Sequence, residues 1–155
     1  MAVPSRVCDG SISGGLASPV LPKQGTAYTE ETRAFDKPGD SSGYCFLRAG
    51  GISVEIKYDL SAGGTFSEEN IEEQAALKGR SSLASGKAKG YVSDRGGALF
   101  VPCPTQRDRD SLAWVTVGYV HADDDLNGSQ EPGFRDLTIA AARYAAQDLL
   151  ACEGA

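Results

Sequence analysis

The sequence lacks any apolar run near the roughly 20 residues that a helix needs to cross a bilayer, and it is short of positive charge. It has 15 Lys and Arg residues against 21 Asp and Glu residues, which gives a formal net charge of −6. Nucleic acids and anionic membranes select proteins with a basic surface. We therefore expect no transmembrane segment and no nucleic-acid partner, and we interpret the acidity as a source of solubility.

Catalytic motifs are equally scarce. His121 is the single histidine, so a Ser–His–Asp or Cys–His arrangement would have to be built around it. The glycine pairs lack the context of a nucleotide-binding loop. Paired carboxylates at 68–69 and 72–73 have the spacing of an exposed helix surface. We therefore assign no catalytic residue and no cofactor, and we expect a protein without catalytic activity.

The four cysteines are spread along the chain, and none belongs to a C-x-x-C pair: Cys8, Cys45, Cys103 and Cys152. Zinc sites usually bring their ligands in close pairs, so this spacing disfavours zinc. Two structural disulfides in an oxidising compartment are the preferred interpretation. The alternative is four buried free thiols in a cytosolic protein.

Four cysteines allow three pairings. We favour Cys8–Cys45 with Cys103–Cys152. The first bridge would hold the N-terminal segment on the early strands, and the second would lock the last helix to the strand that carries Cys103. A bridge between Cys8 and Cys152, which would join the two ends, is the alternative.

The first residues, Met1 to Pro4, contain no apolar segment of a signal peptide. The chain is therefore expected to be either a mature fragment with an added start methionine or a cytosolic protein, and the cysteines favour the first. The expected location is extracytoplasmic: secreted, or tethered to a membrane in a full-length precursor.

The clearest structural pattern is a two-residue alternation over Ile52–Leu60, with Ile52, Val54, Ile56 and Tyr58 on one face. It predicts a strand with one buried face. The apolar segments 97–103 and 112–121 predict a hairpin, and the Ala-rich segment 134–152 predicts a long helix. Weaker patterns predict strands at 26–35, 44–48 and 87–93, a short helix before Pro22, a helix at 67–78 and a loop at 80–86.

Together these elements predict one domain spanning residues 1–155, with 1–7 as a flexible lead-in. The expected fold is α+β: a mostly antiparallel sheet of five to seven strands, with two main helices packed on one face, stapled by disulfides.

One short motif suggests a metal. Asp123, Asp125, Asn127 and Gly128 fit D-x-D-x-N-G, the start of a calcium loop, and Glu131 offers a further oxygen. The twelfth position is Phe134, where an EF-hand has a bidentate Glu. An acidic solvated loop is the alternative. Asp123, Asp125, Asn127 and Glu131 are therefore weak candidate calcium ligands.

The order of the cysteine-bearing segments carries a resemblance. Val7-Cys8-Asp9 opens a short helical segment, Gly43-Tyr44-Cys45-Phe46 forms a strand, and a second cysteine strand precedes an Ala-rich helix with its own cysteine. This order resembles uncharacterised four-cysteine extracytoplasmic domains and lipoproteins of actinobacteria. The resemblance implies a bacterial αβ domain outside the cytoplasmic membrane, with no catalytic residues to transfer. This chain differs in lacking a lipobox and in placing its last cysteine after the helix.

These observations favour an extracytoplasmic binding or interaction module that recognises an unknown protein or small ligand. The alternatives are an enzyme or enzyme inhibitor of unrecognised type, or a calcium-modulated domain built on residues 123–131.

A calcium site in the 123–131 loop predicts saturable binding at millimolar or lower calcium concentration, because alternate oxygen ligands around a glycine bend can enclose the ion. Isothermal titration calorimetry measures it directly. A flat calcium titration would exclude the calcium-modulated alternative.

Overall fold

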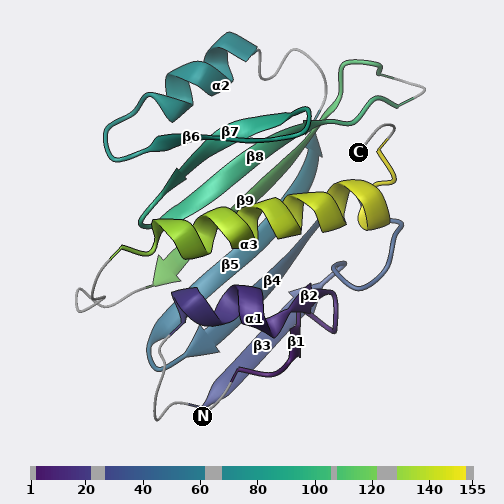
Figure 1. Cartoon of the computed structure of the whole chain (residues 1–155). Helices are drawn as coiled ribbons and strands as arrows, with labels where there is room; N and C mark the ends of the chain where they lie inside the picture. The colour runs from purple at the N-terminus through teal and green to yellow at the C-terminus, as the bar shows by residue number, and fades with distance from the viewer. Residues whose placement is uncertain (1–2, 22–26, 62–67, 106–107, 122–128, 153–155) are drawn as a thin grey trace.

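A seven-stranded antiparallel sheet forms the centre of the molecule (Figure 1). The computed structural model describes residues 3–21, 27–61, 68–105, 108–121 and 129–152. Its strands, in the spatial order β3–β4–β5–β9–β8–β7–β6, are β3 (Tyr28–Arg33), β4 (Ser42–Ala49), β5 (Ile52–Ser61), β9 (Leu112–His121), β8 (Gly96–Pro102), β7 (Ala88–Ser93) and β6 (Ser81–Ser85).

The remaining elements are a two-stranded ribbon and a few helices: β1 (Arg6–Val7), β2 (Ile12–Ser13), α1 (Gly14–Ala17) with the 3₁₀ turn Ser18–Val20, α2 (Glu68–Ala75), and α3 (Glu131–Tyr144) with the π-helical turn Ala145–Leu149. The expected α+β fold class is confirmed, with the number of strands at the upper end of the predicted range.

The alternation predicted for 52–60 defines the middle of the sheet. Ile56 is completely buried, and its register partners are Cys45 on β4 and Val117 on β9. Because side chains alternate between the faces of a strand, the neighbouring Glu55 and Lys57 lie on the other face. The predicted hairpin is also present, since β8 and β9 pair in register from Gly96–Gly118 to Pro102–Leu112.

Helix α3 covers the apolar face of β8 and β9, with the short helix α1 beside it (Figure 1). Its sheet-facing stripe is buried: Phe134, Leu137, Thr138, Ala141, Ala142 and Ala145. The approach is close at Gly97, where an added Cβ would lie 2.6 Å from Thr138 Oγ1. A glycine at this point therefore lets the helix lie directly against the strand.

Helix α2 packs on the opposite face of the sheet, whereas the sequence led us to expect both main helices on one face. Ile71 of α2 clusters with Ala98 and Phe100, which alternate along β8 with the α3-facing residues. The Phe100 ring stacks on Trp114 with centroids 5.8 Å apart. Helix α2 covers this second apolar patch. The continuous apolar run 98–101 is accordingly the pattern of a strand buried on both faces.

Two segments are more ordered than expected. Residues 80–86 were predicted as a loop, yet Ser81–Ser85 form the edge strand β6. A serine-rich segment suffices there because the inward-facing Leu83 is the one buried side chain of β6. Arg6–Val7, within the predicted flexible lead-in, form β1, and Val7 is fully buried beside the bridged Cys8.

Both disulfides have the favoured pairing, Cys8–Cys45 and Cys103–Cys152. All four cysteines are buried. Bridges closing loops of 37 and 49 residues stabilise by about 4 kcal/mol each in the chain-entropy model. Such paired cysteines are typical of an oxidising, extracytoplasmic environment. Among the helices that the structure describes, none is long and apolar enough to span a membrane.

Three tyrosine hydroxyls fasten irregular segments to this framework. Tyr58 donates to the carbonyl of Ala34 at 2.6 Å, Tyr144 to that of Phe35 at 2.8 Å, and Tyr119 to that of Val20 at 2.8 Å. Burial raises the pKa of Tyr119 to about 12, with a smaller opposing effect from the positive charge of Arg95.

The buried Thr138 hydroxyl has no hydrogen-bond partner within the described part of the chain. Replacing an unsatisfied buried hydroxyl by a methyl of similar shape removes its desolvation penalty. We expect Thr138→Val to raise the free energy of unfolding by about 1 kcal/mol in urea denaturation. Thr138→Ser, which keeps the hydroxyl and loses the methyl, should be destabilising. A Val variant less stable than the native chain would contradict this account.

The raised pKa of Tyr119 predicts a loss of stability in alkali. The unfolded chain releases this proton near pH 10 and the folded chain near pH 12, so between these values the folded state binds more protons and stability falls as pH rises. Tyr119→Phe should lower the free energy of unfolding by about 1 kcal/mol at neutral pH and flatten its decline above about pH 9.5. Urea denaturation across this pH range measures both effects, and an unchanged slope would contradict the assignment.

Candidate functional site

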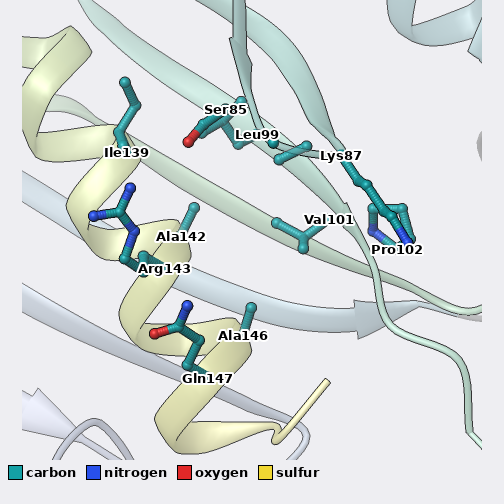
Figure 2. Close-up of a pocket in the computed structure, with 12 residues that line it drawn as sticks. Ser85, Lys87, Leu99, Val101, Pro102, Ile139, Ala142, Arg143, Ala146 and Gln147 are labelled. Carbon is teal, nitrogen blue, oxygen red and sulfur yellow. The ribbon is translucent and has the colours of Figure 1, made fainter. Parts of the chain in front are cut away.

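The best candidate site is a cleft of about 240 Å³ between α3 and the strands β7 and β8 (Figure 2). Helix α3 lies mainly over β8 and β9 and reaches β7 less extensively. The end of the β6–β7 hairpin therefore stands apart from the helix. The twelve residues lining the gap are Ser85, Gly86, Lys87, Ala88, Leu99, Val101, Pro102, Ile139, Ala142, Arg143, Ala146 and Gln147.

Small side chains on α3 and on the π-helical turn that continues it keep the cleft open. Ala142 and Ala146 lie one helical turn apart and point from the helix towards the strands (Figure 2). Both are buried, but their single methyl groups leave space above Leu99 and Val101. Longer aliphatic side chains at these positions would fill the space, so the Ala-rich composition of the helix creates the cleft as well as the close packing over β8.

The floor of the cleft is aliphatic, formed by Ala88, Leu99, Val101, Ile139, Ala142 and Ala146. Ile139 is partly buried, and the other five side chains expose little of their surface to solvent. No aromatic ring is among the twelve lining residues. The floor therefore suits an aliphatic group and offers no stacking platform for a planar ring or a sugar.

The rim carries positive charge on both walls. Lys87 stands on the turn between β6 and β7, and Arg143 stands on α3 across the gap (Figure 2). Both side chains are exposed, and within the described ranges neither forms an ion pair with a carboxylate. In a chain of net charge −6, two such cations at one opening produce a local positive potential.

The Cys103–Cys152 disulfide fixes one end of the cleft. Cys103 follows Val101 by two residues, and Cys152 follows the π-helical turn that carries Ala146 and Gln147. The amide of Cys152 donates to the carbonyl of Ala146 at 2.7 Å, and Ala151 adopts φ +50°. The two walls are thus joined covalently, which limits the change in width on binding a ligand.

The polar side chains in the cleft offer hydrogen bonds and positive charge to a ligand. The polar lining consists of a hydroxyl, two cations and an amide: Ser85, Lys87, Arg143 and Gln147. A serine nucleophile needs an adjacent base, and the lining contains no carboxylate or imidazole. His121 is exposed at the end of β9 and does not line the cleft.

Two other hollows mix charges of both signs. One, on the opposite face of the sheet, contains Glu55 with Arg80 and Arg95. There Arg80 lies 3.9 Å from the Tyr91 ring centroid and donates to the carbonyl of Gln74. The other, at 33–57, contains Asp40 with Arg33 and Lys57. Of the three hollows, the α3 cleft is the one with cations and no carboxylate.

Most of the candidate calcium ligands, namely Asp123, Asp125 and Asn127, lie outside the described residues. Glu131 is described: it begins α3, its amide donates to Asp94 Oδ1 at 3.2 Å, and its carboxylate lies 3.4 Å from Arg135 Nη2. The pKa of Asp94 is lowered, chiefly by the hydrogen bond from Ser129 Oγ at 2.6 Å. The described part of the chain contains no cluster of three or more His, Cys, Asp or Glu residues that could hold a metal.

Sequence reasoning missed the cleft. Lys87 and Arg143 lie 56 residues apart, and neither belongs to a motif. Comparison with protein-family models, curated proteins and solved structures found no match. The assignment of the site therefore rests on its geometry.

Proposed function

We propose that this protein is an extracytoplasmic binding domain without catalytic activity, and that the cleft between α3 and β7–β8 is its ligand site. The observation that carries the proposal is the combination of a buried aliphatic floor with a cation on each wall, neither of which pairs with a carboxylate among the described residues. Ligand sites are typically concave and mostly apolar, with a few polar groups that orient the ligand.

An unfilled cleft between aliphatic side chains is poor packing, so a protein that made no use of the cleft would be expected to fill it. Protein interiors are close-packed, and space beside aliphatic side chains forfeits dispersion contacts. One longer side chain at Ala142 or Ala146 would recover those contacts. Retaining two alanines beneath a charged rim fits a site that is completed by a ligand.

The enzyme alternative has less support. It requires a nucleophile beside a base or a metal, and the cleft offers the Ser85 hydroxyl without an adjacent base. The calcium-modulated alternative depends on Asp123, Asp125 and Asn127, outside the described residues, and on Glu131, whose carboxylate is already paired with Arg135.

The location is part of the same proposal. Two buried disulfides suit an oxidising compartment. A secreted protein, or one tethered to a membrane by a part of its precursor, would satisfy this requirement. The resemblance to four-cysteine actinobacterial domains and lipoproteins supports a bacterial, lipoprotein-like origin.

A fragment screen by nitrogen-15 heteronuclear NMR tests the function. Some fragments of a chemically mixed library should shift the amides of Leu99, Val101, Ala142 and Ala146 in the native protein. Ala142→Leu fills the cleft and should abolish those shifts, whereas Ala76→Leu, on an exposed alanine after α2, should preserve them.

The Ala142→Leu spectrum also reports whether that variant folds, and Ala146→Leu provides a second way to fill the cleft. Fragments that map elsewhere and bind both filled variants would overturn the assignment of the site. A library with no cleft binder would overturn the proposed function.

A further inference from the structure

The geometry points to a ligand class for this cleft: we propose that it binds an aliphatic monocarboxylate, with the acyl chain on the floor and the carboxylate at the mouth, in the positive field of the rim residues Lys87 and Arg143. The inference rests on the proposed binding function. It goes further by specifying the charge, the polarity and the size of the ligand.

The floor selects the tail of the ligand. Leu99 and Val101 on the strand side face Ile139, Ala142 and Ala146 on the helix side, and all five are aliphatic. Burying an alkyl chain against them removes apolar surface from water on both sides. A planar aromatic ligand would meet no ring to stack on, because the lining contains none.

The volume limits the length of the tail. About 240 Å³ lies below the roughly 300–1,000 Å³ of sites for drug-sized ligands. A methylene group is close in size to a water molecule, which occupies about 30 Å³ of the liquid. The space therefore accommodates about eight such groups, the length of an octanoate chain.

The rim selects the head group. A guanidinium presents a planar fork of donors that matches a carboxylate, and a lysine ammonium adds a point charge. Arg143 and Lys87 stand on opposite walls with their charged ends turned away from each other (Figure 2), so a carboxylate at the mouth lies in the positive field of the rim without being clamped between the two cations. A cationic head group would be repelled there, and a neutral one would gain no charge-assisted hydrogen bond.

The charge of the rim is open to a ligand, because no carboxylate in the described ranges pairs with either cation. Arg135, on the same helix, pairs with Glu131 at 3.4 Å, and Arg48 pairs with Glu31 at 3.6 Å. Arg143 and Lys87 differ from them, since the described residues supply neither with a carboxylate partner. Arg135 is therefore a natural control for the loss of one arginine from α3.

Titration with sodium octanoate below its micelle concentration, followed by calorimetry and by the cleft amides in NMR, tests the ligand class. Octanoate should bind at the cleft, and acetate, which lacks the tail, should not. Octylamine and 1-octanol keep the tail but change the head group, and each should bind at least about tenfold more weakly than octanoate.

Three charge-neutralising variants complete the test. Arg143→Gln should weaken octanoate binding about tenfold, and Lys87→Gln should weaken it several-fold, as expected for charged hydrogen bonds and ion pairs at an open rim. Arg135→Gln should leave binding unchanged. All three side chains reach solvent, so the fold should be retained.

The outcomes separate the two proposals. If octylamine or 1-octanol binds in the cleft as tightly as octanoate, the proposed preference for a carboxylate is wrong, while the assignment of the binding site stands. Octanoate affinity unchanged by both Arg143→Gln and Lys87→Gln would lead to the same conclusion. A cleft that responds neither to octanoate nor to any library fragment would overturn the ligand class and the proposed function together.

Discussion

The packing of α3 on the β8–β9 hairpin is the interaction on which the rest of the structure depends. Gly97 allows the helix backbone to lie close to β8, and Cys103–Cys152 ties the end of the helix to the end of the same strand. The helix supports α1 on one side and forms a wall of the cleft on the other. The core, the N-terminal segment and the candidate site are therefore all positioned by one helix.

The sequence predicted the features that depend on local periodicity and missed those that depend on how elements cross. The alternation at 52–60, the hairpin at 97–121 and the last helix are strong local signals, and all three are present. The edge strand 81–85 lacks such a signal, because an edge needs little apolar burial. The placement of α2 is set by the Phe100–Trp114 pair, whose rings come from different strands. Lys87 and Arg143 stand on opposite sides of a gap whose width depends on the path of α3 over the sheet, which no local pattern encodes.

The proposed function depends on how unevenly the helices cover the α3-facing side of the sheet. One half of the α3-facing side is closed by helices, and the β6–β7 end extends past them. Where the hairpin extends past the helix, a cleft with an aliphatic floor remains, and in this chain cations stand at its rim. Under the proposed function, the acidic surface of the protein would repel anionic polymers. The small apolar cleft with cations at its rim would still bind a compact amphiphilic anion.

The two disulfides enclose residues 8–45 and 103–152, and these covalent loops do not overlap. In the sheet they fall on either side of the junction between β5 and β9. The molecule thus has two cross-linked halves with no disulfide between them, and they meet along the β5–β9 ladder, at the contact of α1 with α3, and through the hydrogen bonds of Tyr119 and Tyr144. Under mechanical load the two halves would separate at this interface, and their resistance to separation is set by hydrogen bonds and apolar contacts. The disulfides limit unfolding within each half, whereas the packing of one half on the other depends on non-covalent contacts.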